Sequence, residues 1–449
     1  MEQKTFIHIR KFLKDVIAGT KWEGLVYTVG GCERDFLLGL PIKDIDLVVE
    51  YPNGGIEFAN WLKENGLTAG SVVTYEHYGT AMFRLPLFLP YEIEAVQTRK
   101  ESYRDIESRN PVTAYGTIEE DAHRRDFTVN ALYYNISKEE LLDINSRSLE
   151  DLDNKVIRAS GEPDVIFYED PLRILRAVRF ANRLGFAIEP ETYQGMERYA
   201  NRLSIISQER ITDEFSKIIT GNNACKGLGM LSKLGVFPFV FPYGPNLRKD
   251  EDDCFINRLE FDGDSSYNKI ESLPVNVAAR LSSFFHLDSE KFIEELLKNM
   301  RHSNEMIRKV LFYVKHTDRQ YTSSIRTLRL LAYDCGKFAE KQDLDSEKLF
   351  KNCLRLISVL NDFDKEVTIE KAFSYPFVKE MLSYKMPING QDILDNFKIE
   401  PGPAIKHLLD ECFKLAMSIP YLTKRDFLIY LESRKLLSSE TNETDGDSK

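Results

Sequence analysis

The chain has 449 residues, of which 43% are hydrophobic and 29% are charged. At roughly 150 residues per domain this length predicts about three domains, and the composition excludes fibrous and disordered proteins. The formal net charge is −11, which excludes a polycation. Any nucleic acid must therefore be bound through local basic surfaces.

The six cysteines show no spacing typical of zinc ligands. Scattered thiols of this kind favour a cytoplasmic protein without a disulfide framework. The first residues lack the apolar segment of a signal peptide, and no apolar run reaches the roughly 18 residues needed to cross a bilayer. We therefore predict a cytoplasmic protein without membrane contact, and we predict no protein partner.

Apolar periodicity separates the chain into two parts of different character. The first part predicts helices at 5–18 and 55–65 and strands at 25–29, 45–49, 71–75, 79–85 and 91–98. This order predicts an α+β head on one small mixed sheet with helices. From about residue 171 to 437 the strand signal nearly vanishes, and segments such as 290–299, 324–335 and 405–417 predict an elongated helical array.

These patterns predict the following division of the chain. The segments are a head over 1–140, a helical neck over 141–220, a helical body over 221–300 and a helical tail over 301–437. Residues 242–265 carry Pro, Gly and several Asp, and predict a long surface loop. The small, polar and acidic residues 438–449 predict a disordered end.

The most informative segment covers residues 30–49. Gly30 and Gly31 follow a predicted strand, where they let the backbone approach a bound group closely. Arg34 lies near the start of a predicted helix, in a position suited to phosphate. Asp44 and Asp46 then stand two residues apart at the next strand, so both side chains face the same way.

Two carboxylates held this close raise each other's pKa unless a cation lies between them. Their oxygen ligands suit Mg²⁺, and the pair forms half of a two-metal site for phosphoryl transfer. The alternative is a solvated turn in which Asp44 caps a helix. The combination of two glycines, Arg34 and the two aspartates favours the metal site.

A third carboxylate is expected from the predicted strand 91–98. Glu92 and Glu94 alternate with apolar residues and share one face of that strand. Glu94 precedes an apolar pair and is the candidate third carboxylate. The alternative is an exposed pair on an edge strand, and for Glu92 we prefer it.

A second polar cluster lies at residues 124–132. Arg124 and Arg125 can grip a triphosphate, while Asp126 and Asn130 can form hydrogen bonds with ribose hydroxyls. Asp126 can equally cap a helix that continues through residue 132.

A third cluster lies at residues 169–186. Asp170 is expected at the N-cap of a helix, one turn from Arg173, so that an Asp–Arg pair can form and present donors and acceptors to a base. Arg176, Arg179 and Arg183 share one face of this helix. The alternative is an amphipathic helix with a solvated basic face.

Together these segments resemble the class II tRNA nucleotidyltransferase and bacterial poly(A) polymerase family of the polymerase-β-like superfamily. The resemblance rests on the order and spacing of GG-x-x-RD with D-x-D, RRDFTVNA, EDPLRILRAVRF and SQERITDEF. It covers residues 25–220, and residues 388–409 also resemble the family's tail, less specifically.

The resemblance implies a role for each cluster. Two Mg²⁺ ions would be bound by Asp44 and Asp46, and the triphosphate by Gly31, Arg34 and Arg125. Asp126 and Asn130 would bind the ribose. The base, C or A, would be selected without a template by Asp170 and Arg173, helped by Arg176 and Arg179. Residues 98–109 would form a flexible loop that switches the pocket from CTP to ATP.

Two features depart from the family's pattern. Glu33 stands where the family usually has a small apolar residue, and is expected to place an extra carboxylate near the triphosphate. Ser146 and Ser148 lie near where the family tends to carry glycine. No His-Asp pair of the HD phosphohydrolase type occurs among the seven histidines.

The sequence therefore predicts an enzyme that adds CCA to the 3′ end of tRNA from CTP and ATP, with the helical tail binding the acceptor arm. A poly(A) polymerase or A-adding enzyme on the same site is the alternative, although such polymerases tend to carry a basic extension and this end is acidic. A non-catalytic RNA-binding protein is the third possibility, disfavoured by the intact acidic residues.

Overall fold

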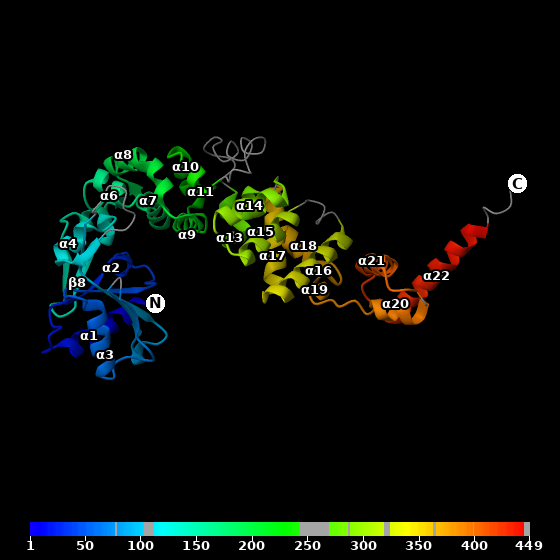
Figure 1. The fold of residues 1–449 in the computed structure, drawn as a ribbon, viewed down its shortest axis with the longest axis horizontal. Coiled ribbons are helices and arrows are strands. Elements are labelled where there is room, and N and C mark those ends of the chain that lie inside the picture. Colours follow the sequence, from blue (N-terminus) through cyan, green and yellow to red (C-terminus); the bar gives the residue numbers. More distant parts are fainter. Residues whose placement is uncertain are drawn as a thin grey trace. The chain divides into compact units, whose positions relative to one another are not determined.

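A computed structural model describes residues 1–76, 79–102, 112–242, 269–285, 288–317, 324–361, 365–397 and 399–443. The chain divides into two compact units (Figure 1). Unit 1 comprises Met1–Tyr267 with Asn299–His302, and unit 2 comprises Asn268–Lys298 with Ser303–Lys449. Most of the predicted surface loop at 242–265 lies outside the described residues.

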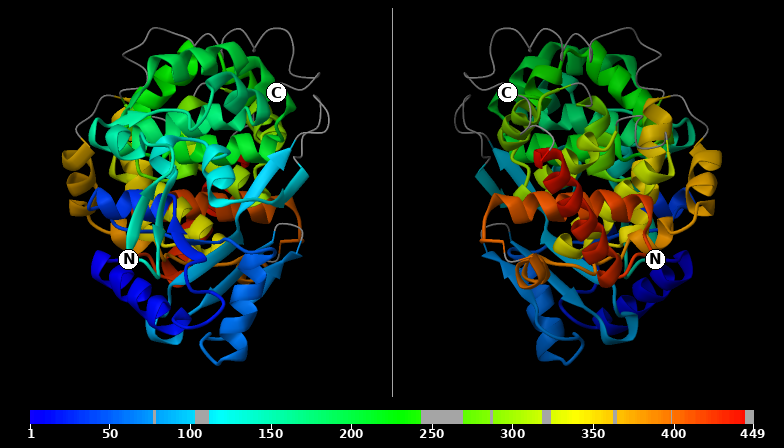
Figure 2. Two further views of the ribbon diagram at one scale, coloured as in Figure 1. Left: turned by 90° about the vertical axis from the view of Figure 1, so that its left-hand side faces the viewer. Right: turned by 90° about the vertical axis from the view of Figure 1, so that its right-hand side faces the viewer.

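The first part of unit 1 is built on a seven-stranded mixed sheet in the order β3-β4-β5-β2-β1-β8-β9 (Figure 2). Its strands are β1 Val26–Val29, β2 Ile45–Val49, β3 Val73–Tyr75, β4 Thr80–Arg84, β5 Glu92–Gln97, β8 Leu132–Asn135 and β9 Glu140–Asp143. The neighbours β2 and β5 run parallel and the other pairs antiparallel. A separate two-stranded sheet joins β6 (Arg99–Ser102) and β7 (Val112–Tyr115).

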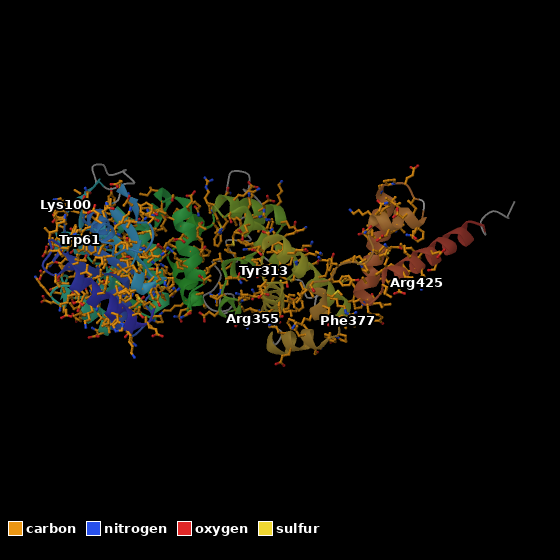
Figure 3. All side chains as sticks on the ribbon, turned by 90° about the horizontal axis from the view of Figure 1, so that it is seen from below. Trp61, Lys100, Tyr313, Arg355, Phe377 and Arg425 are labelled. Atoms are coloured by element: carbon orange, nitrogen blue, oxygen red, sulfur yellow. The ribbon has the colours of Figure 1, made fainter. Side chains whose placement is uncertain are left out.

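The two faces of the large sheet carry different helices. Helices α1 (Gln3–Ile17) and α3 (Gly54–Glu64) share one apolar core with Ile45, Leu47 and Val49 of β2. That core includes Trp22, which packs against Trp61 of α3 at a centroid distance of 6.3 Å (Trp61 is labelled in Figure 3). Since residues alternate along a strand, Asp46 and Val48 lie on the opposite face. There Val48 packs in a second cluster that includes Ile118 of α4 (Ile118–His123).

Helices follow the sheet through the rest of unit 1, joined by one short parallel pair, β10 (Val156–Ile157) with β11 (Ala187–Ile188). These helices are α5 Ser148–Asp153, α6 Pro163–Glu169, α7 Leu172–Leu184, α8 Pro190–Tyr199, α9 Gln208–Ile219, α10 Ala224–Lys233 and α11 Phe237–Val240. Helix α7 contacts both α9 and α10, so it is held between the sheet and the later helices.

The described part of unit 2 is helical. Its helices are α13 Val277–Phe284, α14 Glu290–Asn299, α15 Asn304–Lys315, α16 Ile325–Gln342, α17 Ser346–Leu360, α18 Lys365–Ser374, α19 Val378–Met381, α20 Gly390–Phe397, α21 Pro403–Ser418 and α22 Lys424–Glu443. In the described ranges, no helix is long and apolar enough to cross a membrane. Tyr313 of α15, labelled in Figure 3, is buried and accepts a hydrogen bond from Asn352 of α17.

The predicted fold class, a mixed-sheet head followed by helices, is confirmed. Every strand predicted up to residue 98 is present, whereas β8 and β9 were missed. Helix α22 extends to Glu443, and the predicted disordered end over residues 438–449 remains a prediction. The division into head, neck, body and tail remains a prediction.

Gly55 sits where α3 meets the sheet, and we predict that Gly55→Ala destabilises unit 1. A Cβ at Gly55 would lie 2.6 Å from the Gly79 carbonyl oxygen and 2.7 Å from the Ala95 carbonyl carbon. Backbone atoms cannot turn aside as a flexible side chain can, so α3 must shift. We expect the free energy of unfolding, measured by urea titration with circular dichroism as the signal, to fall by about 1–3 kcal/mol.

Gly229 of α10 provides the matched control, because no atom lies within 4 Å of its Cβ position. Gly229→Ala should stabilise the unit by about 0.5–1 kcal/mol through helix propensity. Equal stabilities of the two variants would contradict the close approach of α3.

Candidate active site

Three carboxylates share the sheet face that carries α4. In the parallel pairing of β2 with β5, Asp46 is the direct partner of Glu94. Asp44 stands two residues before Asp46, just outside β2. Glu94 of the neighbouring strand therefore lies beside Asp46, and its role as the third carboxylate remains a prediction.

The electrostatics of this face reflect the crowding of negative charge. Burial, followed by the charge of Glu94 and a smaller effect of Asp44, raises the pKa of Asp46 from 3.8 to about 6, although Arg125 and Arg34 oppose the shift. Burial also raises the pKa of Glu94, with Arg99 lowering it and Asp44 raising it further. Asp46 is thus held in a position where its negative charge is unfavourable without a cation.

Glu92 behaves differently from Glu94. Its side chain is 42% exposed and pairs with Arg84 of β4 at 3.0 Å. The prediction that Glu92 is exposed is therefore confirmed. The expected edge strand is wrong, because β5 lies between β4 and β2.

The three carboxylates fit a hard cation by their chemistry, because oxygen ligands with repelling charges are stabilised by Mg²⁺ or a similar ion. Their side chains do not form a complete set of metal ligands in this structure. Among the described residues, no three acidic, histidine or cysteine side chains are close enough to hold a metal ion.

The glycine turn lies beside the carboxylates, between β1 and α2 (Gly31–Leu37). Gly30 adopts φ 74°, and a Cβ there would lie 3.3 Å from Arg125 Nη1. A Cβ on Gly31 would lie 3.6 Å from Arg34 Nη2. Two guanidinium groups therefore border the turn. Gly30 is buried and its backbone N–H donates to the Leu132 carbonyl oxygen at 3.1 Å, so the partly exposed backbone of the turn is that of Gly31.

Arg34 itself is buried, contrary to its expected position facing a phosphate. Its Nε donates to Asp35 Oδ1 at 2.8 Å, and its Nη1 donates to Asn130 Oδ1. The helix α2 turns the side chain inward, because its partners lie on α2 and on the 3-10 helix Thr128–Asn130. Arg34 ties these two segments together.

Arg124 and Arg125 share one buried carboxylate that the sequence reasoning missed. Asp121 of α4 pairs with Arg125 at 3.0 Å and with Arg124, and it accepts a hydrogen bond from Tyr133 at 2.8 Å. Burial raises the pKa of Asp121, but the two arginines outweigh it and lower the pKa to about 2. Spacing was the available signal, since Asp121 lies three and four residues before the arginines on a capped helix.

Asp126 connects the sheet to α7. Its Oδ2 accepts from Arg176 Nε at 2.9 Å and from Arg176 Nη2 at 2.6 Å, and its Oδ1 accepts from Asn130 Nδ2 at 3.0 Å. The pKa of Asp126, which burial would raise, is lowered by Arg176 and Asn130. The alternative of a helix continuing through residue 132 is wrong, because a 3-10 turn ends at Asn130 and β8 begins at Leu132.

The arginines on the predicted face of α7 are all paired with carboxylates. Besides Arg176, Arg179 donates to Glu214 of α9 at 2.6 Å, and Arg183 donates to Asp35 at 2.6 Å. The alternative of a solvated basic face is therefore wrong. Glu214 lies in the quoted segment SQERITDEF, but its partner could not be read from the sequence.

The predicted Asp170–Arg173 pair is wrong in detail. Asp170 does accept from the backbone N–H of Leu172 at the start of α7, but its other oxygen accepts from Arg210 Nη2 at 2.9 Å. Arg173 donates instead to the carbonyl oxygens of Arg124 at 2.8 Å and Ile166 at 3.3 Å. Buried carbonyl oxygens thus accept the hydrogen bonds of Arg173. Asp170, which is more exposed, instead accepts from Arg210 of α9.

The expectation that Glu33 lies near a triphosphate is also wrong. Glu33 is 1% exposed and accepts hydrogen bonds from Arg10 of α1 and from Thr28. The Arg10 guanidinium lies 3.9 Å from the Tyr134 ring centroid. Glu33 therefore faces the α1 side of the sheet, opposite to the three carboxylates.

Residues 103–109 of the predicted switching loop, 98–109, lie outside the described residues. Of its first residues, Arg99 and Lys100 belong to β6, and Arg99 N donates to Asp121 Oδ1 at 3.2 Å.

The chain is similar to known proteins both in sequence and in fold. Residues 26–158 match the family model of the poly A polymerase head domain, and residues 185–247 match a probable RNA and SrmB-binding site of polymerase A. The tRNA nucleotidyltransferase cca2 of Schizosaccharomyces pombe is 27% identical over 92% of this chain and 93% of its own length. A CCA-adding enzyme of Ligilactobacillus salivarius is 29% identical over 92% and 93%.

The fold is similar to that of the Bacillus stearothermophilus CCA-adding enzyme in complex with CTP. The TM-score is 0.70 at 20% identity, over 93% of this chain and 94% of that one. The sheet with its carboxylate face and glycine turn defines a nucleotidyltransferase. Parts of the chain thus match two poly A polymerase family models, and the chain is similar over about nine tenths of its length to CCA-adding enzymes and tRNA nucleotidyltransferases.

We predict that Asp46→Asn stabilises the metal-free protein at neutral pH. The folded state binds a proton at Asp46 more tightly than the unfolded chain, so the contribution of Asp46 to the free energy of unfolding falls as the pH rises from 3.8 to 6. The difference between these pKa values corresponds to about 3 kcal/mol, which is an upper value for the gain in Asp46→Asn above pH 6.

Urea unfolding with EDTA at pH 4 and at pH 7.5 measures this gain. The variant should exceed wild type at pH 7.5, and the two should nearly coincide at pH 4. A variant that is less stable than wild type at pH 7.5 would show that Asp46 is well paired.

We predict that the effects of replacing Arg10 and Glu33 on the free energy of unfolding depend on each other. Glu33→Val leaves the Arg10 charge buried without its carboxylate, which costs about 3–5 kcal/mol. The double variant Arg10→Met with Glu33→Val removes both charges, and should recover all but about 1–2 kcal/mol. Thermal unfolding of the four proteins completes the cycle, and additive losses in the double variant would contradict the pairing.

Proposed function

We propose that this protein adds C, C and A to the 3′ end of tRNA, using CTP and ATP and no nucleic-acid template. In each addition the 3′-hydroxyl oxygen attacks the α-phosphorus, and pyrophosphate leaves. The observation that carries the proposal is the register that sets Asp46 beside Glu94, with Asp44 on the same face. The relatives that match about nine tenths of the chain are named CCA-adding enzymes or tRNA nucleotidyltransferases.

Asp44 and Asp46 are the proposed ligands of two Mg²⁺ ions, with Glu94 as the third carboxylate. Bound Mg²⁺ would neutralise the phosphates and favour ionisation of the attacking hydroxyl. The repulsion between Asp46 and Glu94 supports this assignment, because both carboxylates become favourable once a cation balances them.

The triphosphate is proposed to lie against the glycine turn. Gly31 leaves partly exposed backbone there, and Arg125 Nη1 would lie 3.3 Å from a Cβ on Gly30. Arg34, held by Asp35 and Asn130, supplies positive charge from beneath the turn. Arg124, paired with Asp121, adds to that charge from α4.

Asp126 and Asn130 are the proposed ribose contacts. Asp126 already accepts hydrogen bonds from the Phe127 backbone, Asn130 and both Arg176 donors. A carboxylate offers about four lone-pair sites, so a ribose hydroxyl must exchange with one of these donors. Asp126 therefore acts mainly by holding Asn130 and Arg176 in place.

Base selection is proposed to rest on Asp170 and Arg173. Cytosine and adenine both present an amino donor next to a ring nitrogen acceptor, which matches one carboxylate and one guanidinium. Asp170 keeps spare lone pairs beside its bonds to Leu172 and Arg210. Arg176 and Arg179, fixed by Asp126 and Glu214, would help to position the base or the triphosphate.

The helical tail is proposed to bind the acceptor arm of tRNA through phosphate contacts. A cytoplasmic location is also proposed, since Cys32, Cys225, Cys335, Cys353 and Cys412 are free thiols.

Three tRNA transcripts test the reaction, ending at the discriminator base, at CC and at CCA. Each is incubated with Mg²⁺ and with CTP, ATP or both, and resolved on a sequencing gel. Addition of CCA that stops there is expected. One A on the CC transcript alone would indicate an A-adding enzyme, and long A tails a poly(A) polymerase.

Asp46→Ala should lower the rate of incorporation by more than about a thousandfold, while tRNA binding stays within a few fold of wild type. The expected loss follows from the electrostatic role of the carboxylates in phosphoryl transfer. Glu92→Ala is the matched control on the neighbouring strand, because Glu92 is exposed and paired with Arg84. Turnover of Asp46→Ala near wild type would contradict the metal assignment.

A further inference from the structure

Arg210 of α9 contacts the candidate base-selecting carboxylate of Asp170. Its Nη2 donates to Asp170 Oδ2 at 2.9 Å, and the two residues stand 40 positions apart in the chain. The contact joins the first turn of α9 to the junction between α6 and α7. No role was predicted for Arg210, although it lies in the quoted segment SQERITDEF.

Asp170 is held at both oxygens of its carboxylate. Oδ1 accepts from the backbone N–H of Leu172 at 3.2 Å, and Oδ2 accepts from Arg210. The torsion that turns an aspartate carboxylate has a broad energy minimum, so a single donor fixes its plane weakly. A second donor on the other oxygen restricts the rotation. Arg210 therefore sets the direction in which the remaining lone pairs of Asp170 point.

Arg173 does not hold Asp170 in this structure. Its Nη2 donates to the carbonyl oxygen of Arg124 at 2.8 Å, and its Nη1 lies 3.8 Å from Glu169 Oε2. The side chain of Arg173 is 9% exposed, compared with 51% for Arg210. The guanidinium group that lies next to the Asp170 carboxylate is therefore that of Arg210.

The same helix fixes two further arginines of the candidate pocket. Glu214 follows Arg210 by four residues, so both side chains project from one face of α9. Glu214 Oε2 accepts from Arg179 Nε at 2.6 Å, and its Oε1 lies 3.9 Å from Arg176 Nη1. Two residues of α9 thus contact Asp170, Arg176 and Arg179, the residues to which base selection and positioning are assigned above.

We propose that Arg210 is a positioning residue for base selection. By holding Asp170 Oδ2, it directs the free lone pairs of the carboxylate toward the amino group of cytosine or adenine. Uracil and guanine present a carbonyl oxygen in that place, which a fixed carboxylate repels. This role rests on the proposed function, in which Asp170 selects the base.

Loss of Arg210 should affect nucleotide binding and discrimination more than the chemical step. A carboxylate that rotates still accepts from an amino group in some of its orientations, so CTP and ATP remain substrates with weaker binding. UTP and GTP are rejected less strongly, because the carboxylate can turn away from their carbonyl oxygens. An ion pair with a purely structural role would leave the preference between bases unchanged.

The test measures initial rates of nucleotide addition by the full-length protein with Mg²⁺. CTP and UTP are compared on the transcript that ends at the discriminator base, and ATP and GTP on the transcript that ends at CC. In Arg210→Gln, the KM for CTP and ATP should rise about 10-fold, while kcat falls less than about 3-fold. The ratio of kcat/KM for CTP over UTP should fall about 10-fold.

Arg198→Gln is the matched control. Arg198 of α8 pairs with Asp164 at 2.6 Å, and its side chain is 51% exposed, like that of Arg210. Its kinetic constants should stay within about 2-fold of wild type, and urea unfolding should show similar small losses of stability in both glutamine variants. Arg210→Lys keeps the charge on a more flexible side chain, and its selectivity should lie between those of wild type and Arg210→Gln.

Wild-type KM and selectivity in Arg210→Gln would overturn this role while leaving the proposed reaction in place. A fall in kcat with unchanged selectivity, or an equal loss of selectivity in Arg198→Gln, would also overturn it. If the wild-type protein extends no transcript, the proposed reaction is refuted, and the role of Arg210 is refuted with it.

Discussion

The buried contact between Asp126 and Arg176 is the interaction on which the geometry of the site depends. It joins the loop before β8 to helix α7 by two hydrogen bonds to one carboxylate oxygen. The contact continues on one side through Asn130 and Arg34 to Asp35, and on the other through Arg183 back to Asp35. The sheet and α7 are therefore connected by a closed ring of side-chain contacts, which the backbone of α7 completes between Arg176 and Arg183.

Such a ring favours one relative position of its members over all others. Each buried charge is stable only while its partners surround it, so a shift of α7 would leave several charges unpaired at once. The carboxylate face has the opposite character, because Asp46 and Glu94 repel each other. The protein thus combines a satisfied ionic network, which fixes the arginines, with an unsatisfied carboxylate cluster, which favours a bound cation.

Sequence reasoning predicted those features that depend on local spacing. The alternation of β2 placed Asp46 on one face, and the same alternation in β5 placed Glu94 on that face, beside Asp46. The glycine turn followed from two glycines after a strand. These inferences succeeded because strand and turn geometry are set by a few adjacent residues.

Contacts between distant segments could not be predicted in the same way. Asp170 pairs with Arg210 rather than with Arg173, and Arg179 finds Glu214 across α9. Glu33 was placed on the wrong face, because the position of α1 against the sheet is a tertiary property. A charged residue has several possible partners within reach, and only packing decides among them.

The pairing of Arg10 with Glu33 also bears on where the head begins as a folding unit. The match to the family's head domain starts at residue 26, after α1 has ended at Ile17. A shortened head that began there would keep every residue of the proposed site. It would nevertheless lose Arg10, Phe6 and Leu13, leaving the Glu33 carboxylate facing an open apolar surface. In this protein the smallest autonomous head must include a helix that contributes nothing to the chemistry.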